Sequence, residues 1–340
     1  TGPGPRHRRR GFRMMRLPKF SYHAPATVAE AVRILAGEGP TASVVAGGTD
    51  LYPNMKRRHQ TPRTLVGLRL LKELRGISGD PRTGLRIGSC VSLTEVSEHP
   101  MVREGYPEVA AAVELISTPI LRNMGTLGGN ICLDTRCNYY NQNYEWRRAI
   151  NFCMKCDGTV CWVAPSSDTC LAVNSSDTAP LLYALGARVR LVSADGEREV
   201  AVRDFYRRDG ISYLNIKPGE ILTEVLRPAR DGWSASYRNL RRRGAFDFPV
   251  LGVAVVVWRE ADGTVRDAKI VLNAVASAPV EAEEAGKVLL GGKLTPETIS
   301  QAAKRAALVA KPVDNTDFYL AWRKTMARVF TERALTDLLS

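Results

Sequence analysis

The cysteines of this chain are concentrated in one stretch. Six of the seven lie between residues 132 and 170, and only Cys90 lies elsewhere. In a chain without a secretory segment, such local cysteine usage indicates a metal site more than a set of scattered thiols. We therefore expect the rest of the chain to be a scaffold for this loop. The six are Cys132, Cys137, Cys153, Cys156, Cys161 and Cys170.

Iron–sulfur, zinc and unliganded thiols are the three interpretations of this stretch. Structural zinc sites usually combine two tight pairs of ligands, and the stretch offers one CxxC pair, Cys153 and Cys156, with no histidine inside it. A 4Fe-4S cluster accepts four thiolates with looser spacing and favours a shielding shell, for which the tyrosines and tryptophans of the stretch are available. Chemistry favours iron–sulfur, but six cysteines leave two spare, and spacing does not choose them.

The composition is that of an ordinary globular protein. With 340 residues, 44% hydrophobic and 24% charged, the chain is long enough for two or three domains with cores of their own. No apolar run approaches the ~20 residues that span a bilayer, and the N-terminus lacks the apolar core of a signal peptide. We expect a cytoplasmic protein that is not bound to a membrane.

Part of the net charge of +13 lies at the N-terminus. Residues 1–15 carry five arginines and no acid, so removing them leaves 13 − 5 = +8. We interpret this segment as a disordered tail or a cloning remnant. Elsewhere no arginines are interleaved with aromatic residues, so nucleic-acid binding is not predicted. The remaining charge suits an anionic cofactor and an acidic protein partner.

Two glycine motifs are candidates for binding phosphate. An apolar run at residues 43–46 predicts a buried strand, and Gly47-Gly48-Thr49-Asp50 follows it directly before a helix start. Glycines let backbone N–H groups approach a phosphate closely, and a helix start adds its positive dipole. A second glycine turn spans residues 126–130. Each could be only a tight turn, but two of them suggest two sides of a site for one extended, phosphate-bearing ligand.

Periodicity and capping patterns predict an α+β fold. Capping boxes at Thr27 to Glu30 and at Ser92 to Glu95 predict helix starts, and residues 85–93, which include Cys90, predict a strand. Later segments predict a helix capped by Ser176-Asp177, antiparallel strands at 187–202 and 219–228, a long hairpin at 248–275, and three C-terminal helices. Antiparallel sheets with flanking helices are the expected architecture.

Three motifs resemble the FAD-binding subunits of the molybdenum hydroxylases, the xanthine dehydrogenase and carbon monoxide dehydrogenase family. They are VVAGGTDL at 44–51, TLGGNI at 126–131 and SDTAP at 176–180. The resemblance runs from about Leu17 to the C-terminus. It implies a PCMH-type FAD-binding fold of two subdomains, followed by a flavoprotein C-terminal module of antiparallel sheet and helices. The implied domains are a tail (1–15), an N-terminal FAD subdomain (16–75), a second FAD subdomain (76–230) and the C-terminal module (235–340).

In ordinary members of this family the second and third motifs are separated by only a few residues, whereas here residues 132–173 are inserted between them. The insert is similar to that of the β subunits of 4-hydroxybenzoyl-CoA reductases, whose extra loop binds a 4Fe-4S cluster. The ligand pattern of those subunits falls on Cys137, Cys153, Cys161 and Cys170. Cys132 and Cys156 are then the spare thiols.

The resemblance also implies the flavin site. It places two segments around the FAD diphosphate, to which both turns would offer amides. Ile116 matches an apolar position of the flavin pocket, and Asp177 matches an aspartate that contacts the cofactor, although it could equally be the N-cap of its helix. The diphosphate residues are Val44, Val45, Ala46, Gly47, Gly48, Thr49, Asp50, Leu51, Thr126, Leu127, Gly128, Gly129 and Asn130.

The implied activity is the reductive removal of the phenolic hydroxyl of 4-hydroxybenzoyl-CoA, which gives benzoyl-CoA in anaerobic aromatic degradation. Electrons would pass from a ferredoxin through 4Fe-4S and FAD to a 2Fe-2S subunit and a molybdopterin subunit, in an assembly of two copies of each of three subunits. This chain would contain no catalytic residue. The alternatives are the flavin subunit of an oxidative molybdenum hydroxylase that uses NAD or a quinone, and a non-catalytic zinc-stabilised binding module.

Overall fold

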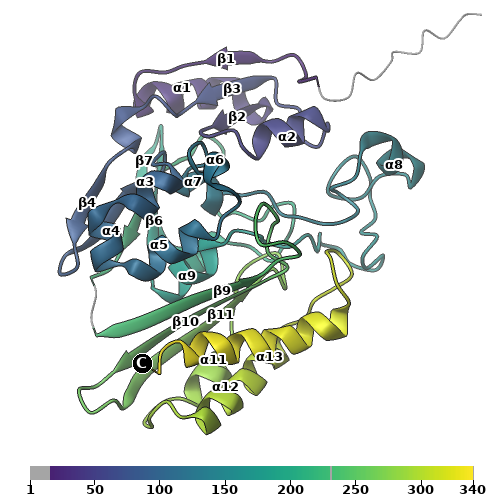
Figure 1. Cartoon of the computed structure of the whole chain (residues 1–340). Helices are drawn as coiled ribbons and strands as arrows, with labels where there is room; N and C mark the ends of the chain where they lie inside the picture. Colours follow the sequence, from purple (N-terminus) through teal and green to yellow (C-terminus); the bar gives the residue numbers. More distant parts are fainter. Residues whose placement is uncertain (1–15, 230–231, 340) are drawn as a thin grey trace, which may run out of the picture.

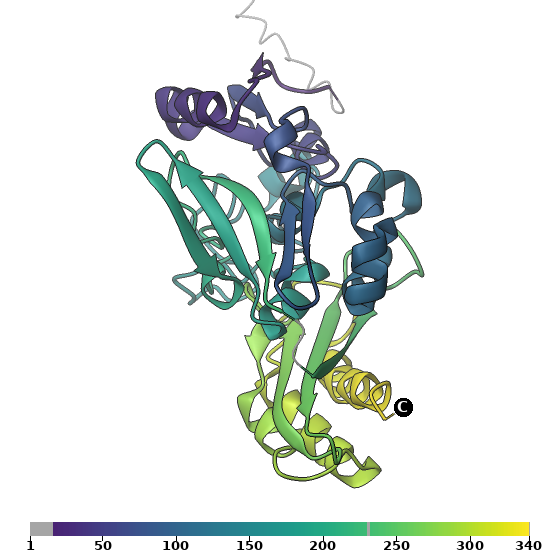
Figure 2. The same ribbon diagram turned by 90° about the vertical axis from the view of Figure 1, so that its left-hand side faces the viewer.

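The structure is a computed structural model that describes residues 16–229 and 232–339. The predicted tail, residues 1–15, lies outside the described residues. Three α+β parts follow one another down the molecule, from the N-terminal part to the C-terminal helices (Figures 1 and 2). The predicted α+β class is confirmed. No helix in these described ranges is long and apolar enough to cross a membrane.

The first part is a small parallel sheet with two helices. Helix α1 begins where predicted, because the Thr27 side chain accepts a hydrogen bond from the Glu30 amide at 3.1 Å. The Glu30 carboxylate, however, accepts from the amide of Ala26, and the helix runs past Gly37 to Gly39, whose φ is +64°. The strand order is β1-β3-β2. The elements are β1 (Ser21–His23), α1 (Val28–Glu38), β2 (Ala42–Val45), α2 (Leu51–Lys56) and β3 (Thr64–Gly67).

The second part is an antiparallel sheet of five strands in the order β4-β5-β8-β6-β7. Its strands are β4 (Ile77–Asp80), β5 (Gly84–Gly88), β6 (Arg188–Ser193), β7 (Gly196–Ala201) and β8 (Ile221–Arg227). Strand β5 ends before Cys90, so the prediction of a strand through Cys90 is wrong, although the residue is buried.

The helices of this part cover one face of that sheet (Figure 2). The capping box at Ser92 and Glu95 is confirmed at the start of α3. The helices are α3 (Leu93–Glu98), α4 (Pro100–Gly105), α5 (Pro107–Glu114), α6 (Pro119–Arg122), α7 (Leu127–Ile131), α9 (Thr178–Ala184) and α10 (Val202–Phe205).

The third part contains the predicted long hairpin, which pairs β10 (Leu251–Arg259) with β11 (Val265–Asn273). Strand β9 (Trp233–Leu240), which was not predicted, pairs with the other edge of β10. Alternate residues of β10 enter different cores: Val253 and Val255 pack with the C-terminal helices, whereas Ala254 and Val256 pack with the second part. This sheet therefore joins the two parts. The remaining elements are β12 (Val280–Glu281), α11 (Glu283–Lys287), α12 (Pro296–Val309) and α13 (Leu320–Thr336).

The insert, residues 132–173, forms a lobe beside α2 with little regular structure (Figure 1). Its one helix is α8 (Tyr144–Ala149), which begins at the side-chain cap of Asn143. Its two ends are held together by a bridge in which the amides of Arg136 and Val173 each donate to the other's carbonyl, at 2.9 and 2.8 Å. The lobe therefore leaves the second part and returns to it at the same place.

Candidate functional site

A cleft of about 1160 Å³ lies where the three parts meet. It is large enough for an extended ligand, since pockets for small molecules commonly measure about 300–1000 Å³. The structure brings the predicted cofactor residues together along it, with Leu127 as the exception because its side chain lies in the core of the second part. The predicted residues that line it are Val44, Val45, Ala46, Gly47, Gly48, Thr49, Asp50, Leu51, Ile116, Thr126, Gly128, Gly129, Asn130 and Asp177.

The two glycine motifs lie against each other. A Cβ atom on Gly47 would overlap the carbonyl oxygen of Met124, and one on Gly128 would lie 2.6 Å from the Cβ atom of Ser89. Gly48 has a φ of +71°, in the region that favours glycine. Close approach of the backbones therefore requires glycine at these positions.

The first glycine motif offers free donors. The amides of residues 47–50 lie along the cleft just before α2, and they donate no hydrogen bond within the part of the chain that the structure describes. Consecutive free amides form a concave site for an anion. This motif fits a diphosphate through its backbone.

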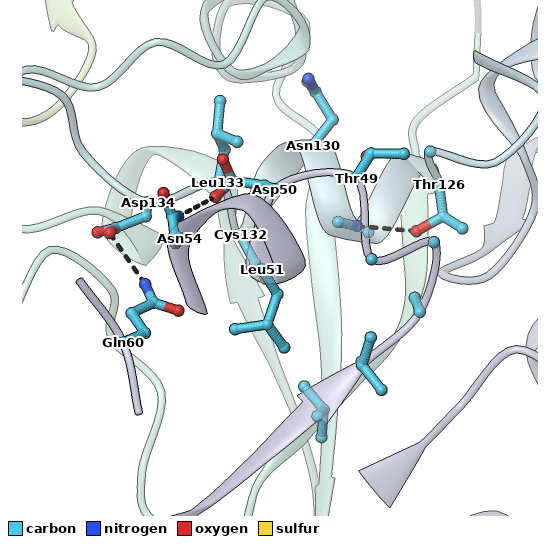
Figure 3. Close-up of a pocket in the computed structure, with 18 of the residues that line it drawn as sticks. Thr49, Asp50, Leu51, Asn54, Gln60, Thr126, Asn130, Cys132, Leu133 and Asp134 are labelled. Atoms are coloured by element: carbon cyan, nitrogen blue, oxygen red, sulfur yellow. Dashed lines mark hydrogen bonds between the residues drawn. The ribbon is translucent and has the colours of Figure 1, made fainter. Parts of the chain in front are cut away.

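The second glycine motif differs from the expectation. It is not a turn but the first turn of α7, and its amides are already used: Leu127 and Gly128 donate to the carbonyls of Val91 and Ser89, and Gly129 donates to the Thr126 hydroxyl at 3.1 Å (Figure 3). In this structure these three amides are therefore not free, in contrast to those of residues 47–50. The motif forms a close-packed wall of the cleft, and its contact with a diphosphate stays a prediction.

Asn130 connects the second motif with the SDTAP segment across the insert. Its side-chain oxygen accepts from the hydroxyls of Ser176 and Thr178, at 2.8 and 2.7 Å. All three residues are buried. Residues 126–131 and 176–180 thus form one unit, and the insert leaves this unit as a side branch.

Asp177 is a buried carboxylate at the wall of the cleft. The Tyr237 hydroxyl and the Asn239 amide, both on β9, donate to its Oδ1 at 3.0 and 2.7 Å. Burial raises the pKa of Asp177 to about 6, and the two donors oppose that shift. Its side chain makes no capping bond to α9, whereas the Ser176 hydroxyl accepts from the Ala179 amide. Asp177 thus occupies the N-cap position of α9, but its side chain does not cap the helix.

Sequence reasoning missed the charged residues that the insert contributes to the cleft. Arg136 is buried, forms an ion pair with Asp50 and donates to the Asn54 side chain at 3.3 Å. Its guanidinium lies 4.3 Å from the ring centroid of Phe248, and burial lowers its pKa to about 10. Asp134 lines the same wall and accepts from Gln60 at 2.9 Å (Figure 3). No local pattern in the sequence marks either residue.

The four predicted cluster ligands, Cys137, Cys153, Cys161 and Cys170, are all buried in the insert. The pKa of Cys137 is raised to about 12, chiefly by burial; hydrogen bonds from the backbone of residues 139 and 140 oppose this shift, and the thiols of Cys170 and Cys153 contribute to it. Burial likewise raises the pKa of Cys170 to about 11, with Cys161 and Cys153 contributing in the same direction. Cys137, Cys153 and Cys170 share one buried cluster, against which Cys156 also packs. Cys161 is the fourth buried thiol and acts on Cys170.

The two spare cysteines have other neighbours. Cys132 lines the flavin-side cleft and packs against the core of the second part. Cys156 accepts a hydrogen bond from the Arg147 guanidinium at 3.0 Å and contacts Asp157. Burial raises the pKa of Cys132 to about 12 and that of Cys156 to about 11.

The donor set of the insert fits a cluster better than a single ion. All seven cysteines lie in the described ranges and none forms a disulfide. In those ranges no three His, Cys, Asp or Glu side chains are arranged to hold one metal ion, so a zinc site is not supported. A 4Fe-4S cluster has four cysteine ligands on different irons, which need not converge on one point.

Buried side chains hold the insert against the rest of the chain. Arg147 is fully buried, and besides Cys156 it donates to the carbonyls of Arg57 and Arg58, at 3.3 and 3.4 Å. His59 contacts the insert through the carbonyl of Gln142, at 3.0 Å. Because a buried guanidinium is costly without an anion, the environment of Arg147 also suits a negatively charged group nearby.

The chain matches two families of known proteins. Residues 18–230 match the FAD binding domain in molybdopterin dehydrogenase, and residues 235–338 match the CO dehydrogenase flavoprotein C-terminal domain. The carbon monoxide dehydrogenase medium chain of Afipia carboxidovorans is 31% identical over 317 residues, which cover 93% of this chain and 95% of that protein. The aldehyde oxidoreductase FAD-binding subunit PaoB of Escherichia coli (strain K12) is 30% identical over 92% of this chain and 98% of its own length.

The chain is also similar to solved structures. A chain of a Cu,Mo-CO dehydrogenase in its cyanide-inactivated form superposes with a TM-score of 0.78 at 30% identity. The match covers 95% of this chain and 98% of that one.

Proposed function

Because the chain belongs to the FAD-binding subunits of the molybdenum hydroxylase and carbon monoxide dehydrogenase family, we propose that it is the flavin and iron–sulfur subunit of a 4-hydroxybenzoyl-CoA reductase. The family matches confirm the predicted PCMH-type FAD-binding fold and the flavoprotein C-terminal module. The chain is thus an oxidoreductase subunit that binds FAD. The observation that carries the finer proposal is that the insert buries four thiols, of which Cys137, Cys153 and Cys170 share one buried cluster. Cys156 packs against the same cluster, so its exclusion from the ligand set rests on the family resemblance.

In the cleft, the chain's own groups bind and orient the flavin. The free amides of residues 47–50 suit the diphosphate. The Asp177 carboxylate, held by Tyr237 and Asn239, fixes the C-terminal module against the wall of the cleft. Bound FAD supplies one- and two-electron chemistry.

In the insert, we assign the cluster ligands to Cys137, Cys153, Cys161 and Cys170. The four thiols and the Tyr140 ring are buried, and Arg147 supplies a buried positive charge at the neighbouring Cys156. Burial and net charge are two of the features with which a protein adjusts the reduction potential of a cluster. The insert would thus be an electron port next to the flavin cleft.

We propose that the chain relays electrons from a ferredoxin to a 2Fe-2S subunit and a molybdopterin subunit, in an assembly with two copies of each. The expected basic docking surface is not on the insert. Arg136, Arg147 and Lys155 have buried side chains, and the exposed charges of the insert are Arg148, Glu145, Asp157 and Asp168. A ferredoxin attracted by positive charge would have to approach over another surface.

The relatives favour one alternative function. The matched proteins are a carbon monoxide dehydrogenase and an aldehyde oxidoreductase, so the chain could be the flavin subunit of an oxidative enzyme that passes electrons to NAD or a quinone. A flavin subunit of that kind needs no cluster of its own. Membership of the flavin family excludes a zinc-stabilised module without flavin.

Metal and flavin analysis of the anaerobically purified full chain tests the proposal. We expect FAD together with about four iron and four sulfide per chain, as a 4Fe-4S cluster requires. Cys153→Ser should lower the iron content while Cys132→Ser retains it. Flavin without iron would support the oxidative alternative and overturn the cluster. Full iron retention in Cys153→Ser would overturn the ligand assignment.

A further inference from the structure

Lys155 is a buried lysine that connects the two candidate redox sites. It belongs to the insert, and its side chain is only 6% exposed. Its ammonium donates to Asp134 Oδ1 at 2.9 Å, to the Thr135 hydroxyl at 2.8 Å and to the Gly210 carbonyl at 2.6 Å. All three donor positions are therefore used, and the charge has a fixed place.

The ammonium lies on the side of the cysteine cluster. Gly210, which accepts from Lys155, also donates its amide to the Cys170 carbonyl at 2.8 Å. A Cβ atom on Gly210 would lie 2.8 Å from the Cys170 sulfur, so this glycine packs directly against the thiol. Lys155 is also one of the groups that oppose the effect of burial on the pKa of Cys170.

The carboxylate of the pair lies on the side of the flavin cleft. Asp134 lines the cleft and Lys155 does not. Gln60 and the Tyr140 hydroxyl also donate to Asp134, at 2.9 and 3.0 Å, and Figure 3 shows the Gln60 contact at the cleft wall. The ion pair is therefore oriented, with its positive end at Cys170 and its negative end at the cleft.

We propose that the Lys155–Asp134 pair sets the difference in reduction potential between the cluster in the insert and the flavin in the cleft. The inference rests on the proposed function, because it needs both centres. Reduction adds negative charge to a centre. A fixed ammonium beside Cys170 favours the reduced cluster, and a fixed carboxylate at the cleft disfavours the reduced flavin, more strongly in a buried site than in water.

The pair would thus make the passage of an electron from the cluster to the flavin less favourable than it would be without the two charges. Lys155 and Asp134 are positioning residues in this scheme, since they act on the centres through charge and touch no substrate. The two charges have opposite effects on the reduction potentials, so removing one or the other should shift the midpoints in opposite directions.

The test is a redox titration of the full chain with its partner subunits under anaerobic conditions. Electron paramagnetic resonance reports the cluster, and visible absorption reports the flavin. We expect Lys155→Met to shift the cluster midpoint to more negative values. Asp134→Asn should shift both midpoints to more positive values. Arg148→Met removes an exposed charge from the same insert and should leave both midpoints unchanged. Lys155→Gln is the second neutral variant if Lys155→Met does not fold.

The outcomes distinguish a failure of the proposed function from a failure of the inference about Lys155 and Asp134. A chain that contains flavin but no iron overturns the proposed function and this inference together. A chain with full iron content in which the two variants shift the midpoints in the same direction, or not at all, overturns the inference alone. Opposite shifts support it, because a purely structural role of the ion pair would not change sign with the charge removed.

Discussion

The flavin cleft and the cysteine insert are stabilised by different parts of the chain. In the cleft, main-chain segments pack directly against each other: Gly47 packs on the Met124 carbonyl, and the amides of residues 47–50 are left free. In the insert, long side chains replace regular structure. Arg147 and Lys155 bind carbonyls and carboxylates that belong to distant segments, and α8 is the one helix in residues 132–173.

The difference indicates how each region responds to change. A backbone site tolerates no added atom, because two main chains cannot move apart without disturbing the sheet and helices behind them. A region held by side chains loses stability one contact at a time. It also needs its buried charges to be compensated, since a buried polar group without a partner costs about 1–3 kcal/mol.

Gly47→Ala should have the largest effect. The new Cβ atom would overlap the Met124 carbonyl oxygen, so we expect loss of bound FAD and a decrease of about 4 kcal/mol in the free energy of unfolding. Gly37→Ala is the matched control, because Gly37 lies within α1 and a Cβ atom there meets nothing within 4 Å. It should stabilise the chain by about 0.5–1 kcal/mol. The flavin content and the urea unfolding curve of each variant measure these effects. Equal effects of Gly47→Ala and Gly37→Ala would contradict the conclusion that close backbone packing maintains the cleft.

Asp177 should make the stability depend on pH. Its pKa is raised to about 6 in the folded chain from 3.8, so between pH 4 and pH 6 the unfolded chain loses this proton and the folded chain keeps it. Folding therefore becomes less favourable as the pH rises through this window, by about 3 kcal/mol. Asp177→Asn should lack this loss, and its stability relative to the native chain should rise from pH 4 to pH 7. A difference independent of pH in urea unfolding would refute the assignment.

Arg147→Met tests the insert. It removes the hydrogen bonds that Arg147 donates to the carbonyls of Arg57 and Arg58, and we expect the insert to lose about 2 kcal/mol of its attachment to the first part. Limited proteolysis should then cut within residues 132–173 faster than in the native chain. Arg148→Met is the control at the next position, since the Arg148 side chain is 64% exposed and forms an ion pair with the exposed Glu145. Similar cleavage rates in the two variants would contradict the role of Arg147.

The sequence predicted local features well. The capping box at Ser92, the hairpin through Asp262-Gly263 and the strand, glycine, helix order at residues 42–56 depend on neighbours within a few positions. Such patterns follow from backbone chemistry, which is the same in any protein. The strand β9 was missed because its polar residues, among them the exposed Arg238, break the apolar run that marked its neighbours.

Contacts across long distances in the sequence were not predictable. His59 meets Gln142, and Lys155 meets Gly210, through spacing that follows no helical or strand period. The side-chain partners of Asp177 were missed for the same reason: a helix cap is a local interpretation, whereas Tyr237 and Asn239 lie in another part of the chain. The clustering of the cysteines was visible in the sequence, but their separation into four and two came only from the family resemblance.

Thr126→Ala should have the smallest effect and decides what the second glycine motif does. The Thr126 hydroxyl caps α7 by accepting from the Gly129 amide, and loss of such a cap costs about 1 kcal/mol. If the motif is a packed wall, the variant should keep its FAD and lose only this stability. If the Gly129 amide binds the diphosphate when FAD is present, freeing it should tighten FAD binding. A flavin titration of the variant and the native chain distinguishes the two, and tighter binding would show that both motifs serve the diphosphate through their backbone.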